Sequence, residues 1–122
     1  MTKERDLDKE KAFYDSQLKA HNGGDAMATA NLGVCYQYGI GVKEDQRQAF
    51  LHYEKAYKAG FVHAANHIGA FYLYGTGGVK EDKNQAFLYF EIAYNRGFKE
   101  AAINLGYCYQ FAMGVKQDKN TA

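Results

Sequence analysis

Two histidines are the residues of this sequence whose type and spacing come closest to a metal site. His63 and His67 stand four residues apart, the spacing at which two side chains on one face of a helix can share an ion. A zinc site needs three or four protein ligands, and the sequence places no third ligand beside this pair. We therefore interpret the two histidines as solvated or groove-lining residues, and we predict no metal site and no cofactor.

Nucleophilic catalysis is the second chemistry that the residue types could support. A cysteine or serine nucleophile requires a neighbouring base, most often a histidine. Cys35 and Cys108 lie in helical patterns without a histidine at a neighbouring position, and no serine, histidine and aspartate can be ordered into a triad. Because the two cysteines occupy one position of a repeat, two units apart, they are too far from each other for a disulfide. We expect free thiols in a reducing compartment and no enzymatic activity.

The glycines belong to a repeated sequence motif, and this repeat determines the fold class that we predict. Three copies of it are present, at residues 32–42, 68–79 and 105–115. Gly33, Gly69 and Gly106 mark the copies, separated by 36 and then 37 residues, and such a period is the signature of a repeat protein. The loop Gly39–Gly41 lacks the lysine, the serine or threonine and the preceding strand of a phosphate-binding loop, so we interpret it as a turn.

Composition excludes several classes of partner. The chain has 122 residues, of which 47% are hydrophobic and 24% charged, as in an ordinary globular domain. Its formal net charge of +1 provides no field that would attract nucleic acid or an anionic membrane. The sequence has no apolar run near the membrane-spanning length, and it begins with charged residues where a secretory signal would be apolar. We expect a cytoplasmic protein with no nucleic-acid partner and no membrane insertion.

Each repeat is expected to contain two helices joined by the glycine turn. An opening helix over about residues 2–22, with Leu7, Lys11, Tyr14 and Leu18 one above another, would serve as the end cap. Asp25, Asp45, Asp82 and Asp118 would cap later helices. A glycine inside the first helix of each repeat suggests close contact with the second helix. The expected division is a capping helix and three repeats, the last incomplete, at residues 1–24, 25–60, 61–97 and 98–122.

The repeat has the consensus Ala-x-x-x-Leu-Gly-x-x-Tyr-x-x-Gly-x-Gly-Val-x-x-Asp-x-x-x-Ala, followed by a closing Ala-x-x-x-Gly. Over about residues 20–122 this resembles the Sel1-like repeat family, a relative of the tetratricopeptide repeats. The resemblance implies an all-α, right-handed α-α superhelix, or solenoid, whose first helices line a concave surface. It also implies adaptor or scaffold roles in protein assemblies, including bacterial signalling and host interaction.

The resemblance also suggests where a partner would bind. By analogy with tetratricopeptide repeats, the first helix of each repeat would present a mixture of apolar, amide and tyrosine side chains on the concave face. Such a surface suits an extended peptide or a helix of a protein partner. Leu73 and Tyr107 are of special interest, because they are apolar where exposure would favour polar residues. The predicted partner-binding residues are Gln37, Tyr38, Asn66, Leu73, Tyr74, Ile103, Tyr107 and Gln110.

Three further hypotheses accompany this prediction. One branch of the family, rich in cysteine with a disulfide in every repeat, is linked to penicillin binding and β-lactam hydrolysis. This chain lacks the paired cysteines, so we do not expect that activity in it. The incomplete third repeat could instead pair with another copy of the chain. If the source is an intracellular bacterium, the resemblance implies an effector delivered into a host cell.

Overall fold

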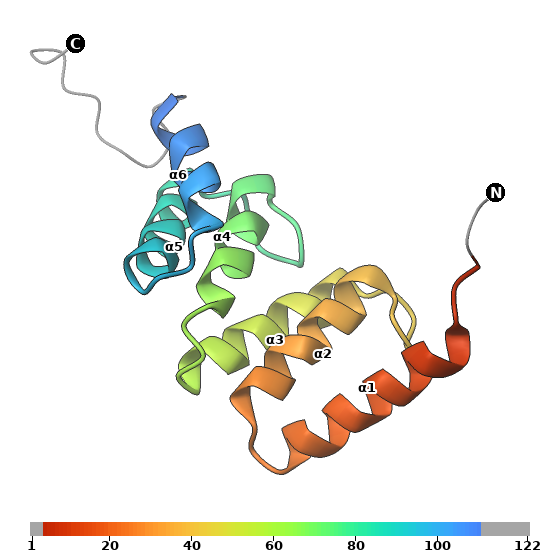
Figure 1. The fold of residues 1–122 in the computed structure, drawn as a ribbon. Coiled ribbons are helices and arrows are strands. Elements are labelled where there is room, and N and C mark those ends of the chain that lie inside the picture. Colours follow the sequence, from red (N-terminus) through yellow and green to blue (C-terminus); the bar gives the residue numbers. More distant parts are fainter. Residues whose placement is uncertain (1–3, 111–122) are drawn as a thin grey trace, which may run out of the picture. The chain divides into compact units, whose positions relative to one another are not determined.

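The computed structural model describes residues 4–110, and all regular secondary structure in that range is helical (Figure 1). The helices are α1 (Leu7–Asn22), α2 (Ala26–Tyr38), α3 (Gln46–Lys58), α4 (Ala64–Tyr74), α5 (Lys83–Asn95) and α6 (Ala101–Gln110). The all-α fold class predicted from the repeat is thereby confirmed. Asp118 and the helix that it was expected to cap lie outside the described residues. None of the helices between residues 4 and 110 has the length and apolarity needed to cross a membrane.

The chain divides into two compact units, Met1–Phe61 and Val62–Ala122. In the first unit, α2 packs against both α1 and α3. In the second unit, α5 packs against both α4 and α6. We call α2, α4 and α6 the A helices, and α3 and α5 the B helices, because each A helix opens one copy of the repeat.

Aspartate side chains cap the starts of α2, α3 and α5, as predicted, whereas α4 begins after His63 without a side-chain cap. The Asp25 carboxylate accepts hydrogen bonds from the backbone N–H groups of residues 27 and 28, at the start of α2. Asp45 accepts one from Gln48 and Asp82 accepts one from Gln85, each at 3.0 Å. Each bond satisfies a donor that the first helical turn leaves unpaired, and each is worth about 1 kcal/mol.

The opening helix is shorter than predicted, and the two leucines of its predicted stripe lie exposed. It begins at Leu7 rather than near residue 2, because the Asp6 carboxylate accepts the backbone N–H of Lys9 and starts the helix there. Leu7 and Leu18, expected in the apolar stripe, are exposed. Tyr14, which belongs to the same predicted stripe, contacts α2, and its hydroxyl lies 3.0 Å from that of Tyr36. A second polar contact joins Gln17 of α1 to Asn31 of α2, and α1 has no fully buried residue.

Glycines inside the A helices allow close contact with the B helices, as the sequence suggested. A methyl group at Gly33 would lie 2.9 Å from the ring of Tyr53, and one at Gly69 would lie 2.6 Å from the ring of Phe90. Both rings are completely buried. The closeness of ring and backbone offsets the helix-propensity cost of glycine, which is about 1 kcal/mol.

The glycine turns after α2 and α4 have the same backbone geometry. Gly39 and Gly75 end α2 and α4 with φ values of 66° and 65°, in the left-handed region that favours glycine. The interpretation of these loops as turns is therefore confirmed. Gly41 has a second role, since a side chain there would collide with the backbone of Glu10 in α1.

Candidate functional site

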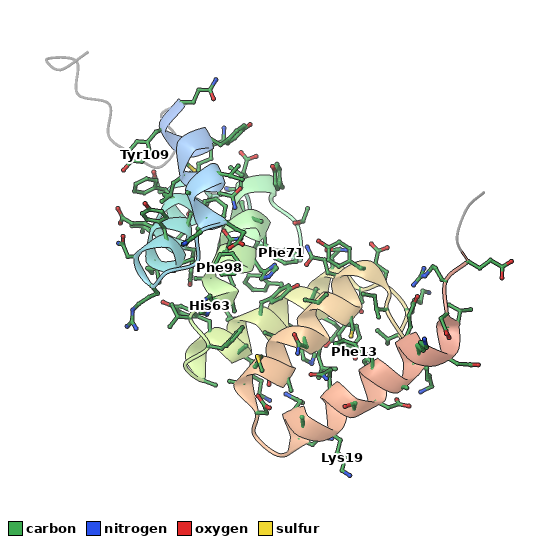
Figure 2. All side chains as sticks on the ribbon, viewed as in Figure 1. Phe13, Lys19, His63, Phe71, Phe98 and Tyr109 are labelled. Atoms are coloured by element: carbon green, nitrogen blue, oxygen red, sulfur yellow. The ribbon has the colours of Figure 1, made fainter. Side chains whose placement is uncertain are left out.

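His63 stands at the N-cap position of α4 and His67 lies within that helix. His63 is exposed and its ring packs edge-on against that of Phe98, with centroids 5.3 Å apart (Figure 2). His67 is partly buried, and this burial lowers its pKa. Among residues 4–110 no group of three or more histidine, cysteine, aspartate or glutamate side chains is arranged to hold a metal ion.

The cysteines behave as small apolar side chains. Cys35 and Cys108 are both free thiols and both completely buried. Burial raises the pKa of each thiol, which disfavours the thiolate that a nucleophile or a metal ligand must supply. The prediction that they are free and packed in the core is confirmed.

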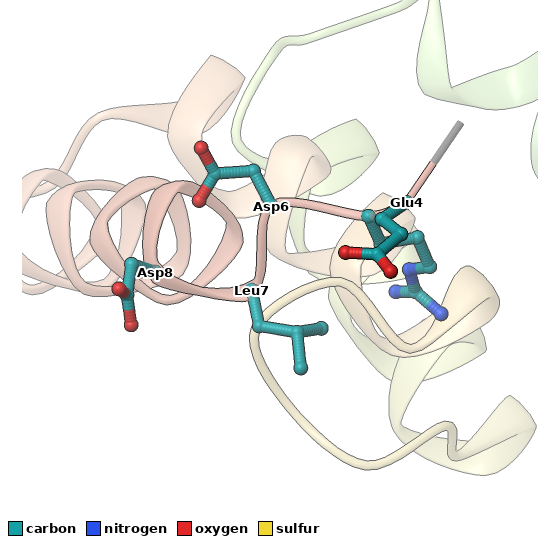
Figure 3. Close-up of a pocket in the computed structure, with 5 residues that line it drawn as sticks. Glu4, Asp6, Leu7 and Asp8 are labelled. Carbon is teal, nitrogen blue, oxygen red and sulfur yellow. The ribbon is translucent and has the colours of Figure 1, made fainter.

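A shallow depression at the start of α1 is lined by Glu4, Arg5, Asp6, Leu7 and Asp8 and has a volume of about 420 Å³. Figure 3 shows the carboxylates of Asp6 and Asp8 pointing in different directions, so they do not converge on one point. Arg5 instead pairs with Glu10 and donates to the carbonyl oxygen of Gly39 at 3.0 Å. These contacts connect α1 to the first glycine turn, and we assign them a structural role.

Tyr38 and Gln37 are the predicted binding residues of the first unit, and they differ in accessibility. Tyr38, at the end of α2, is 62% exposed. The Gln37 side chain is only partly exposed, and its Oε1 accepts a hydrogen bond of 2.7 Å from the Tyr53 hydroxyl. Tyr38 is thus available to a ligand, whereas Gln37 supports the contact between α2 and α3.

Leu73 and Tyr74 are adjacent on α4 and have opposite environments. Tyr74 occupies the same repeat position as Tyr38 and is 67% exposed. Leu73 is only 5% exposed, so the expectation that it lies on an open face is wrong. It belongs to a core cluster with Ala86, Phe87, Phe90, Leu105 and Cys108. The leucine is apolar because residues of α5 and α6 cover it.

The outer face of α6 carries the most exposed apolar residue of the described chain. Ile103 is 79% exposed and Tyr107 is 41% exposed, one turn apart, and Gln110 is exposed on the next turn. The buried residues of α6 are Ala101, Leu105 and Cys108. The helix therefore has a core face and a separate apolar face that meets solvent.

An amide pair lies beside this outer face. The Nδ2 of Asn104 donates to the Oδ1 of Asn66 at 2.9 Å, and both side chains are partly buried. In the first unit Asn31 donates in the same way to Gln17, also at 2.9 Å. Asn66 is one of the residues predicted to bind a partner, whereas Asn104 is not. The sequence does contain a signal for Asn104, because Asn31 and Asn104 both stand two residues before the glycine inside their helices.

A second polar cluster, not anticipated from the sequence, lies between α1, α2 and α3. The Nδ1 of His21 lies 2.6 Å from the Thr29 hydroxyl, and the His21 ring is 5.6 Å from that of His52. Burial lowers the pKa of His21, with smaller contributions from the positive charge of Lys55 and from His52. The hydrogen bond to Tyr36 and burial raise the pKa of Tyr14 to about 12.

Comparison with known proteins identifies the repeat. The family model described as Sel1 repeat matches residues 26–61, 62–98 and 99–122. Among solved structures, a protective antigen of uropathogenic Escherichia coli that displays an SLR fold is 31% identical, with a TM-score of 0.77 over 87% of this chain. A Sel1 repeat protein from Oxalobacter formigenes is 32% identical, with a TM-score of 0.77 over 86% of this chain.

One relative is similar over a shorter stretch. DAP3-binding cell death enhancer 1 of Rattus norvegicus is 40% identical over 55 residues, which are 45% of this chain. The chain spans only 11% of that rat protein. It covers 22% of the E. coli antigen chain and 41% of the Oxalobacter chain.

Proposed function

Because the chain belongs to the Sel1 repeat family, we propose that it is a protein-interaction module that binds a peptide or helix of a partner on the exposed faces of its A helices. The observation that carries this proposal is the outer face of α6. Ile103 and Tyr107 expose apolar area on successive turns, and the core of α6 does not require either of them to be apolar. Exposed apolar residues grouped in this way mark interaction sites more often than isolated ones do.

The polar groups beside this face suit a polypeptide ligand. An asparagine side chain offers two N–H donors and one carbonyl acceptor. The bond between Asn104 and Asn66 uses one donor of Asn104 and part of the acceptor capacity of Asn66. The remaining amide groups can pair with the backbone N–H and C=O groups of a bound segment, while Ile103 and Tyr107 supply apolar contact.

Tyr38 and Tyr74 support the same interpretation of the other A helices. Each stands at the last position of its helix, directly before the left-handed glycine. A tyrosine fixed on a helix supplies a large contact area at a low cost in side-chain entropy, which is why tyrosine is enriched in binding energy hot spots. We propose that these two residues extend the binding face in their respective units.

The experiment first isolates a partner from a lysate of the organism that makes this protein, with the full chain immobilised as bait. Ile103→Ala and Tyr107→Ala are then compared with the wild type by calorimetry. We expect each variant to weaken binding by about tenfold or more. Leu88→Ala is the matched control, because Leu88 is an exposed leucine on a B helix. Loss of affinity in the control, with none in the α6 variants, would move the binding site to the B helices.

The β-lactam hydrolase alternative receives no support from the cysteines. That branch of the family carries a disulfide in every repeat, whereas Cys35 and Cys108 are free. Self-association, a cytoplasmic location and delivery into a host cell stay predictions of the sequence and of the resemblance. Light scattering over a range of protein concentrations tests the first of them directly.

A further inference from the structure

A pair of histidines joins α1 to α3 in the first unit. The rings of His21, in the last turn of α1, and of His52, in the middle of α3, have centroids 5.6 Å apart. The Tyr36 ring of α2 lies 5.1 Å from that of His52. Three helices therefore meet at one partly buried cluster that contains two imidazoles, the type of side chain that changes charge between pH 5 and pH 8.

Each imidazole is held in place by a hydrogen bond of its Nδ1. The Nδ1 of His52 donates to the backbone carbonyl oxygen of Gln48 at 2.7 Å, within α3. The Nδ1 of His21 lies 2.6 Å from the Thr29 hydroxyl of α2. Because a carbonyl oxygen can only accept, a second proton on the His52 ring must be added at Nε2. Neither ring can turn away from the other without breaking its bond, so positive charges on the pair separate only if α1 moves.

The charged groups around the pair do not compensate an added proton. Burial makes the largest contribution to the lowered pKa of His21, and Lys55 and His52 on α3 lower that pKa further. No carboxylate of residues 4–110 contributes to it. Asp25, in the connection between α1 and α2, uses its carboxylate to cap α2. A proton on the pair therefore adds positive charge near Lys55 without a negative partner.

The helix that can respond to this charge is α1. It has no fully buried residue, whereas α2 and α3 each bury several apolar side chains. Its contacts with α2 include two further polar pairs, Tyr14 with Tyr36 and Gln17 with Asn31. The connection to α2 contains Gly24, whose φ of 95° lies in the region that favours glycine. A segment with few buried apolar contacts opens at a lower free energy than the core, so α1 can separate while α2 and α3 stay packed.

We propose that His21 and His52 form a pH-sensitive switch that holds α1 on α2 and α3 at neutral pH and releases α1 alone in mild acid. The pKa of His21 is lowered while α1 is docked, so the released form binds the proton more tightly. Release therefore sets in as the pH falls below the ordinary histidine value of about 6.5. It uncovers the face of α2 that carries Tyr36. The switch does not depend on the function proposed above, which rests on Ile103 and Tyr107 of the second unit.

The first experiment measures hydrogen exchange of the full chain by mass spectrometry between pH 7.5 and pH 5.5, with rates corrected for the intrinsic effect of pH on exchange. We expect the protection of α1 amides to fall by about fivefold or more. The protection of α2 and α3 amides should change much less. Equal loss of protection in all three helices would show global unfolding instead of release. That result, or constant protection of α1, would overturn the proposal.

The second experiment changes the charge beside the pair. Lys55 is exposed, so Lys55→Glu leaves the packing intact and places a carboxylate where it stabilises a proton on the histidines. We expect α1 of this variant to keep its protection at pH 5.5. Lys58→Glu is the matched control, because it makes the same charge change on the same helix at a lysine that does not act on His21, and it should behave like the wild type. His52→Asn removes the facing imidazole and should also reduce the response to acid. Equal loss of α1 protection in the wild type and in Lys55→Glu would refute the proposal.

Discussion

The side chains of Asn104 and Asn66 join α6 to α4 through a hydrogen bond of 2.9 Å between residues 38 positions apart. Core contacts of the second unit run mainly through α5, which packs on both of these A helices. The amide bond therefore adds a polar contact to the core cluster that Leu73 of α4 shares with α6, and it lies beside the proposed binding face.

Breaking this bond should reduce the stability of the second unit. In Asn104→Ala the partly buried Oδ1 of Asn66 loses its donor, so we expect a loss of about 1 kcal/mol in the free energy of unfolding. Urea denaturation followed by circular dichroism measures the change. The double variant with Asn66→Ala completes a mutant cycle, and additive effects of the two changes would show that the bond contributes nothing.

Alanine at Gly69 and at Gly106 should change stability in opposite directions. At Gly69 the added methyl group meets the buried ring of Phe90, and we expect a loss of about 1–3 kcal/mol. At Gly106 it meets no described atom, so the better helix propensity of alanine should stabilise α6 by up to about 1 kcal/mol. Thermal unfolding of both variants measures the signs. Phe90→Leu in the Gly69→Ala background should recover part of the loss, and failure to do so would contradict the steric explanation.

These glycines illustrate how far the sequence determines the fold. Gly33 and Gly69 recur at one position of a repeat, and recurrence alone predicts that a neighbouring helix comes close there. Recurrence also predicts the aspartate caps and the glycine turns, because those features depend on local backbone geometry. The contacts inside a pair of helices are therefore accessible to prediction from a single chain.

The candidate site was harder to predict, because exposure depends on which helices cover which face. Leu73 was selected as an exposed apolar residue, but residues of α5 and α6 bury it. Asn104 was missed because its role depends on a partner 38 positions away. On α1, Tyr14 of the predicted stripe contacts α2, but Leu7 and Leu18 of the same stripe are exposed. In each case tertiary contact, not local pattern, decided the environment.

Mild acid should destabilise the protein through its partly buried histidines. The pKa values of His21 and His67 are both lowered in the folded protein, chiefly by burial. The unfolded chain therefore binds more protons, and stability is lost as the pH falls through the unfolded histidine value of about 6.5. The slope cannot exceed about 1.4 kcal/mol per pH unit for each histidine. Chemical denaturation between pH 8 and pH 5 measures it.

His21→Asn provides the comparison for the first unit. Asparagine can still bond to Thr29, but it does not titrate in this range, so the variant should lose less stability than the wild type as the pH falls. An unchanged pH dependence in this variant would show that His21 makes no contribution. The double variant with His67→Asn should have the smallest slope of the set.

The two buried thiols should report separately on the two units. Cys35 lies in the first unit and Cys108 in the second, and burial together with a raised pKa should make both react slowly with a disulfide reagent while the protein is folded. A variant that destabilises one unit should accelerate labelling of the cysteine in that unit by opening its core.

We therefore expect Gly33→Ala to accelerate labelling of Cys35 more than that of Cys108, and Gly69→Ala to accelerate labelling of Cys108 more than that of Cys35. Peptide mass spectrometry of timed labelling reactions measures both rates in one sample. Equal acceleration of both cysteines in both variants would mean that the units open together, because in a repeat protein only strong coupling between neighbours makes unfolding all-or-none.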